Sequence, residues 1–206
     1  PKKNKVGIDS FVYTATDAAG KTSREATVTI QIRKPTDASQ YSDTLGRGCR
    51  FAAEWMKNTG IFTGECIGGS PCFSPDKEVS RGEFVTMLVK ALQIPTDSRV
   101  TETGYPDVPE WLRPYLAAAI RSGLTSGLAS SETFSPDQPV TCADAAAMLC
   151  AALGLQQQEQ PALSAEAVPP DYREVAAQNG FDFSGALLNR SDAATVLYQA
   201  SQYRNP

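Results

Sequence analysis

Two near-copies of one stretch constrain the fold of this chain more than any other feature. The segment "FSPDKEVSRGE" runs from Phe73 to Glu83, and "FSPDQPVTCAD" runs from Phe134 to Asp144. Two such copies in 206 residues indicate an internal repeat, in which neighbouring units stack and bury a shared core. The copies differ at one position of chemical interest, because Arg81 of the first copy is Cys142 in the second.

Each copy lies between two stretches of helical character. Their Ala- and Leu-rich sequences place apolar residues at helical spacing and are broken by Gly and Pro. The expected helices lie near residues 47–59, 80–93, 110–122, 141–154, 171–179 and 190–203. These form three helix pairs, and the third has lost its long loop, since Gly180 is followed much sooner by Arg190 than Gly60 is by Arg81. The sequence therefore predicts a mainly α fold.

The first part of the chain has a different pattern. Residues 8–34 alternate apolar and polar positions on both sides of the turn sequence "DAAGK", which predicts strand, turn and strand. A lone two-stranded hairpin is marginally stable in water, and its unpaired edges are expected to seek a partner. Residues 35–40 are a short polar linker.

The amino-acid composition disfavours several classes of function. The net charge is −4, so the basic surface that binds nucleic acid is missing. Histidine is absent, which disfavours catalysis and metal binding, and the FSPD loops lack the ligand spacing of a calcium loop. No apolar run is long enough for a membrane span. The five cysteines form no CxxC pair, which disfavours a zinc site. Cys66 and Cys72 either close a small disulfide loop or are two free thiols.

The starts of the second helices carry a polar pattern of their own. Ser80, Thr141 and Asn189 are predicted N-caps, with Glu83, Asp144 and Asp192 as reciprocal caps three residues later. Arg81 and Arg190 stand at the first helical position, where the helix dipole opposes a cation by about 0.3–1 kcal/mol. Free backbone N–H groups together with a guanidinium suit a carboxylate or phosphate ligand. The alternative is that each arginine lies on the surface or pairs with a neighbouring acid, Glu83 or Asp192.

Other polar and aromatic residues admit two interpretations. Asp43 in "YSD" and Asp107 in "YPD" are good cap or turn residues, and a carboxylate at a groove edge also accepts hydrogen bonds from sugar hydroxyls. Trp55 and Trp111 either fill space between helices or stack on a sugar ring.

These motifs resemble those of S-layer homology domains, which occur in threes and anchor proteins to bacterial cell walls. The matching features are the aromatic-x-Asp start, the G-[IL]-x-x-G helix end, the F-x-P loop and the T-R-A-E-like helix opening, over residues 41–203. The resemblance implies a pseudo-threefold helical bundle. Its inter-repeat grooves would bind secondary cell-wall polysaccharide, often pyruvylated, through the motif arginine and the opening aspartate. The implied glycan-binding residues are Arg81, Asp43, Asp107, Arg190 and Glu83.

The N-terminal pattern resembles the last two strands of a bacterial cadherin-like or immunoglobulin-like surface domain. On these resemblances, residues 1–34 are C-terminal strands of such a β-sandwich, with the linker at 35–40. Repeats follow at 41–97, 98–156 and 157–206, the last one degenerate. In the third repeat Ala165 aligns with the opening aspartate, and in the second Cys142 replaces the arginine. Repeat one alone keeps both the aspartate and the arginine.

The expected function is non-covalent anchoring of a larger extracellular protein to the cell wall, at the cell surface, with no catalysis and no cofactor. The expected partner is secondary cell-wall polysaccharide, with a further protein partner at the N-terminal hairpin and neither nucleic acid nor membrane. The alternative is a structural or protein-interaction module that keeps the fold but has lost glycan binding. The deleted third loop and Cys142 favour this alternative.

Overall fold

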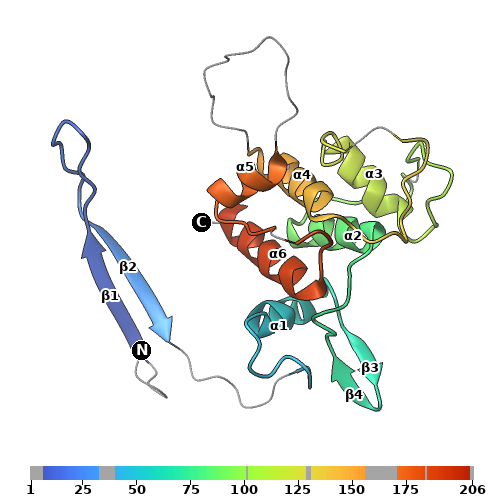
Figure 1. Cartoon of the computed structure of the whole chain (residues 1–206), viewed down its shortest axis with the longest axis horizontal. Coiled ribbons are helices and arrows are strands. Elements are labelled where there is room, and N and C mark those ends of the chain that lie inside the picture. Colours follow the sequence, from blue (N-terminus) through green and yellow to red (C-terminus); the bar gives the residue numbers. More distant parts are fainter. Residues whose placement is uncertain are drawn as a thin grey trace, which may run out of the picture. The chain divides into compact units, whose positions relative to one another are not determined.

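A computed structural model describes residues 7–32, 40–100, 102–128, 131–155, 171–183 and 185–204. The chain divides into two compact units, Pro1–Ala38 and Ser39–Pro206, which are described separately (Figure 1).

The first unit contains two antiparallel strands, β1 (Gly7–Tyr13) and β2 (Ala26–Ile32). Phe11 lies opposite Val28, and Tyr13 lies opposite Ala26. Because side chains alternate between the faces of a strand, these four residues share one face. Phe11 and Tyr13 are each 53% exposed, so the described part of this unit does not bury its apolar face.

The second unit is helical. Its helices are α1 (Arg50–Asn58), α2 (Arg81–Ala91), α3 (Arg113–Arg121), α4 (Cys142–Leu153), α5 (Tyr172–Gln178) and α6 (Arg190–Arg204). Six helices among the described residues confirm the prediction of a mainly α fold. A short hairpin of β3 (Glu65–Ile67) and β4 (Ser70–Cys72) projects from them (Figure 1).

Three short segments, each just before a helix, bond to one another in a closed ring. Val79 N–H donates to Leu188 O at 2.9 Å, Val140 N–H donates to Val79 O at 2.9 Å, and Leu188 N–H donates to Val140 O at 3.0 Å. These residues precede α2, α4 and α6 and are fully buried. Buried backbone groups need such partners, so the ring fixes the starts of the three helices relative to one another.

Helices pack in pairs around this ring, and one of these pairs joins the first helix of the unit to the last. Contacts join α1 to α6, α2 to α3 and α4 to α5. The core cluster of the described chain runs from Tyr41 to Ala200, so it belongs entirely to the second unit. Its large buried side chains include Phe84, Leu116, Met148 and Leu197.

The predicted N-caps form at all three helix starts, whereas the reciprocal bond forms as predicted at Glu83, and the carboxylates of Asp144 and Asp192 accept from the Arg81 and Asn189 side chains instead. Ser80 and Glu83 make a reciprocal capping box at α2. Thr141 accepts a bond from Asp144 N–H, and Asn189 and Asp192 bond to each other through both backbone and side chain.

The suggested Cys66–Cys72 disulfide is not formed. The segment is instead the β3–β4 hairpin, in which Cys66 lies opposite Pro71 and Cys72 lies opposite Glu65. Cysteines one step apart in an antiparallel register point to opposite faces. Cys72 Sγ lies 3.3 Å from the Ser42 hydroxyl instead.

Candidate functional site

The two opening aspartates clamp the FSPD loops. Asp43 accepts from Phe73 N–H at 2.8 Å and from Ser74 N–H at 2.7 Å. Asp107 does the same for Phe134 and Ser135, at 3.0 and 2.6 Å. The clamp holds an unusual backbone, because Ser74 and Ser135 have φ of 55° and 53°, a conformation that L-residues rarely adopt. Each carboxylate thus has a structural role, which is to hold its FSPD loop in this conformation.

The Asp107 environment has opposing effects on its pKa. Partial desolvation of this exposed residue raises the pKa, but the N–H groups of Phe134, Ser135 and Asp107 itself together lower it by more, so the net pKa lies below its usual value. The clamp is therefore ionised at neutral pH, as a double acceptor must be.

Arg81 reaches from α2 to the next FSPD loop. Its Nε donates to Phe134 O at 2.9 Å, its Nη1 donates to Asp144 at 2.5 Å, and the guanidinium lies 5.0 Å from the centre of the Phe134 ring. The Arg81 side chain is 18% exposed and that of Asp144 is 29% exposed. The acid that pairs with Arg81 is therefore not its neighbour Glu83 but Asp144, at the corresponding position of α4.

Arg190 extends from α6 to the first FSPD loop and contacts it as Arg81 contacts the second. Its Nη1 donates to Phe73 O at 3.1 Å, its Nη2 donates to Glu65 at 2.8 Å, and the guanidinium lies 4.6 Å from the centre of the Phe62 ring. Glu83 lies 3.8 Å away. The side chain is 2% exposed, and its buried Nε has no acceptor among the described residues. Arg190 is thus a core residue in this structure.

Cys142 stands where a third such arginine would stand. It is 2% exposed, and burial followed by the charge of Asp192 raises the pKa of its thiol. The three positions form a cyclic pattern: Arg81 faces Asp144, Cys142 lies near Asp192, and Arg190 lies near Glu83. Two of the three contacts are guanidinium–carboxylate contacts, and the thiol cannot make the third.

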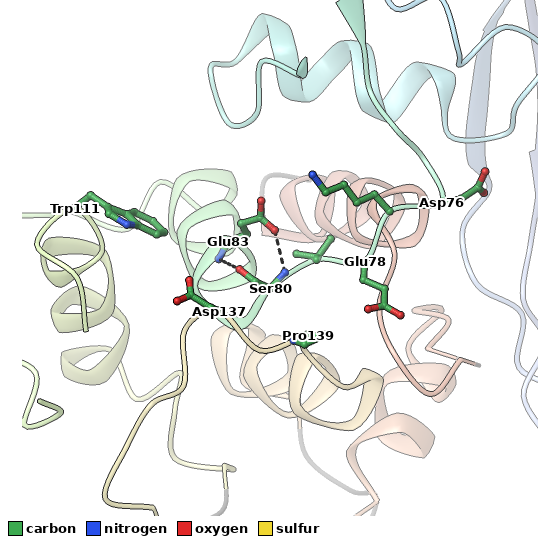
Figure 2. A pocket seen from close by; sticks show the side chains of 9 residues that line it. Asp76, Glu78, Ser80, Glu83, Trp111, Asp137 and Pro139 are labelled. Carbon is green, nitrogen blue, oxygen red and sulfur yellow. Dashed lines mark hydrogen bonds between the residues drawn. The ribbon is translucent and has the colours of Figure 1, made fainter. Parts of the chain in front are cut away.

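An open groove of about 670 Å³ lies beside these residues (Figure 2). It is lined by Asp76, Lys77, Glu78, Val79, Ser80, Glu83, Trp111, Asp137 and Pro139. Trp111, just before α3, is 54% exposed. Figure 2 shows Trp111 toward one end of the lining, with Glu83, Ser80 and Asp137 between it and Asp76. The groove combines an aromatic wall with carboxylates that can accept hydrogen bonds.

A smaller pocket of about 260 Å³ lies at Arg81. Its lining includes the hydroxyl residues Ser131, Thr133 and Ser135 in addition to Phe134 and Asp144. Among the described residues Arg81 makes its hydrogen bonds through Nε and Nη1, and Nη2 has no partner there.

The structure brings some of the predicted residues together and not others. Glu83 and Trp111 line one groove, while Arg81 lines the neighbouring pocket. Asp43, Asp107 and Arg190 line neither of these two, and Trp55 packs against the core. Ala165 lies outside the described residues. Sequence reasoning missed Asp144 and Glu65 as partners of the arginines, since no local signal connects them.

The helix start, the clamped loop and the exposed tryptophan belong to a segment with a known counterpart. Residues 104–146 match the family model described as "S-layer homology domain". An S-layer homology domain is present at this part of the chain. The domain contains Asp107, Trp111, α3 and the first turn of α4 with Asp144.

A second comparison supports the S-layer homology domain. The chain is 29% identical over 186 residues to the "Surface-layer 125 kDa protein" of Lysinibacillus sphaericus. The match covers 87% of this chain and 15% of that relative. Both comparisons indicate a structural protein of the cell surface, associated with the cell wall, and they support an anchoring role.

The described residues contain neither a metal-binding cluster nor a membrane-spanning helix. No group of three or more acidic, Cys or His side chains there could hold a metal ion. No described helix combines the length and apolar character that crossing a membrane requires.

Proposed function

We propose that residues 41–206 anchor a larger surface protein by binding secondary cell-wall polysaccharide, and that they comprise three S-layer homology repeats, 41–97, 98–156 and 157–206. The closed ring through Val79, Val140 and Leu188 supports three equivalent units, because each of these residues occupies the same place before a second helix. The cyclic pattern at Arg81, Cys142 and Arg190 supports the same division.

The observation that carries polysaccharide binding is Trp111. An indole ring that is 54% exposed beside a groove of about 670 Å³ offers a face on which a sugar ring can stack. Glu78, Glu83 and Asp137 line the same groove and can accept hydrogen bonds from sugar hydroxyls. Carboxylates repel an anionic substituent, so this groove suits an uncharged part of the polymer.

The pocket at Arg81 suits an anionic part, such as a pyruvate ketal. Arg81 Nη2 and three hydroxyl residues provide the donors. Asp144 already neutralises part of the Arg81 charge, so the ketal would rely on hydrogen bonds as well as on charge. Ser80 lines the groove and Arg81 lines the pocket, so adjacent residues at the start of α2 would serve both parts of one polymer.

The other predicted site residues have a supporting task in this proposal. Asp43 and Asp107 hold the FSPD loops, and Arg190 joins α6 to the first of these loops. Glu83 caps α2 while its carboxylate lines the groove.

Co-sedimentation with purified sacculi tests the proposal. We expect Trp111→Ala to weaken binding by about ten-fold, because loss of an aromatic anchor costs on the order of 1–2 kcal/mol. Tyr203→Ala is the matched control, since Tyr203 is also an exposed aromatic residue, at 51%, but does not line the groove. Chemical removal of pyruvate ketals should weaken binding of the wild type.

The role of Arg81 needs a stability measurement beside the binding measurement, because Arg81→Ala also breaks the pair with Asp144. If ketal removal weakens the wild type and Arg81→Ala to the same extent, Arg81 does not bind the ketal. Binding that ignores both Trp111→Ala and ketal removal would contradict the anchoring mechanism.

A structural or protein-interaction module is the second candidate. The observation in its favour is that Arg190 and Cys142 are both 2% exposed, so two of the three motif positions are closed to a ligand. If this candidate is correct, the wild-type chain does not bind sacculi, and neither Trp111→Ala nor Arg81→Ala changes that result.

We also propose that residues 1–34 are C-terminal strands of a cadherin-like or immunoglobulin-like domain. The exposed Phe11 and Tyr13, which share one face of β1, support this, since strands of a β-sandwich bury one face against a second sheet. We further propose that this β-hairpin binds a protein partner.

A further inference from the structure

Three aromatic side chains meet on the surface between α1 and α6. The Tyr198 ring lies 5.1 Å from that of Phe51 and 5.4 Å from that of Trp55, both in edge-to-face arrangements. Phe51 is 64% exposed, whereas Trp55 and Tyr198 are partly buried. These edge-to-face contacts hold the three rings together on one surface.

A corresponding helix contact in the same unit has no aromatic residue at these three positions. The contact of α2 with α3 corresponds to that of α1 with α6. Pro114 and Ala118 stand as far before Gly123 as Phe51 and Trp55 stand before Gly60, and Val89 stands as far after its N-cap as Tyr198 does. The same helix contact thus forms with small or aliphatic side chains. The helix contact can therefore form without an aromatic trio, although here Trp55 and Tyr198 also pack against the core.

Charged groups beside the trio compensate each other. Arg50 and Glu54 pair on the same helix at 3.1 Å, with side chains 21% and 19% exposed. Glu54 lies three positions after Phe51 and is therefore its neighbour on the surface of α1. The surface therefore offers aromatic rings beside a neutralised pair of polar groups, which suits an uncharged ligand with hydroxyl groups.

We infer that Phe51, Trp55 and Tyr198 form a second carbohydrate-binding surface, separate from the Trp111 groove, which takes an uncharged sugar ring of the wall polysaccharide. The inference rests on the wall-binding function and repeat arrangement proposed above. None of the three residues lines the groove or the Arg81 pocket. Two surfaces on one unit would bind one long polymer with higher avidity than either alone.

Tryptophan fluorescence can isolate this surface. The chain has two tryptophans, so Trp111→Phe leaves Trp55 as the sole reporter. The probe is soluble polysaccharide released from purified sacculi by dilute acid. We expect a saturable change in Trp55 emission, and about a ten-fold weaker midpoint when Phe51→Ala is added. Pro114→Ala is the matched control at the corresponding position of α3, and it should leave the midpoint unchanged.

The outcomes separate this inference from the proposed function. Sacculus binding that depends on Trp111, together with Trp55 emission that does not respond, overturns the second surface alone. A Trp55 response that Phe51→Ala does not weaken also overturns it. If Phe51→Ala instead converts a concentration-dependent dimer into a monomer without changing the polysaccharide midpoint, the surface binds a second copy of the chain and the carbohydrate assignment is wrong. If Trp111→Ala does not weaken binding to sacculi, the groove assignment is wrong. The Trp55 emission response to soluble polysaccharide still tests the second surface.

Discussion

Arg190 shows how the role of a residue depends on its distant partners. A buried cation is costly unless hydrogen bonds and a carboxylate compensate it. Here Glu65, Phe73 O and the more distant Glu83 do so, and Lys77 also contacts Glu65. The charge of Arg190 is therefore tied to the β3–β4 hairpin.

Removing the partner carboxylate should be more damaging than a surface change. Glu65→Gln leaves Arg190 buried with Glu83 at 3.8 Å as the nearest acid, so we expect a loss of about 2–4 kcal/mol in the free energy of unfolding. Urea unfolding measures this. Glu132→Gln, at an exposed position, is the control and should change stability by less than about 0.5 kcal/mol. Equal effects of the two substitutions would show that the Arg190 pair does not stabilise the fold.

The same contact predicts a pH dependence. Hydrogen bonds from Arg190 and then Lys77 lower the pKa of Glu65 from 4.5 to about 2. A lowered carboxyl pKa gives stability that is fully present above the unfolded value and is lost as pH falls toward the folded value. The difference in urea midpoint between wild type and Glu65→Gln should therefore shrink as pH falls from about 4.5 toward 2. A difference that stays constant over this range would contradict the assignment.

The FSPD loop is the element whose shape depends most on one side chain. Both oxygens of Asp107 are used by N–H groups of the loop, whose Ser135 is in a left-handed conformation. The FSPD sequence shared by the two copies thus forms a loop that is stabilised by an aspartate, and this aspartate belongs to the opening motif of the same repeat.

Asp107→Ala should loosen this loop. It leaves the N–H groups of Phe134 and Ser135 without their carboxylate acceptor. Because the first bond is only partly buried and the second is exposed, we expect a loss of about 1–2 kcal/mol in the free energy of unfolding. Chemical denaturation measures the loss, and hydrogen exchange at these two amides should become faster. Asp137→Ala, an exposed acid in the same loop, is the control. Unchanged exchange at Phe134 and Ser135 would argue against the clamp.

The turn before β3 gives a second prediction for an element. Gly64 has φ of 79°, and a Cβ there would meet the Tyr41 ring and lie 2.6 Å from Cys72 O. Gly64→Ala should destabilise by about 2–5 kcal/mol, since backbone strain and overpacking act together. Gly60→Ala is the matched control, because Gly60 has φ of 69° but open space around it, and only about 1–2 kcal/mol is expected. Similar losses at both positions would rule out the packing contribution.

At the scale of the second unit, the hydrogen-bonded ring joins segments from its beginning, middle and end. Val79, Val140 and Leu188 each donate and accept one bond in it, and α1 packs on α6. No helix pair therefore has a core of its own.

This connection predicts cooperative unfolding. Calorimetry of the Ser39–Pro206 unit should give one transition, with the calorimetric enthalpy equal to the van't Hoff enthalpy, because loss of any helix pair opens the ring. Removing residues 186–206 should abolish that transition. Separate transitions for parts of the unit would contradict the ring as its organising contact.

The sequence by itself determined the features that depend on neighbouring residues. Helical periodicity and capping residues act within a few positions, so the helices and the caps at Ser80, Thr141 and Asn189 could be predicted. The tertiary structure alone decided which groups meet across the repeats. Arg81 pairs with Asp144 and Arg190 pairs with Glu65, far from each arginine in sequence, and no local preference specifies such partners. The register of β3 and β4, which separates Cys66 from Cys72, was likewise set by pairing and not by composition. Local interactions are encoded locally, whereas the environment of a charged side chain depends on every segment packed around it.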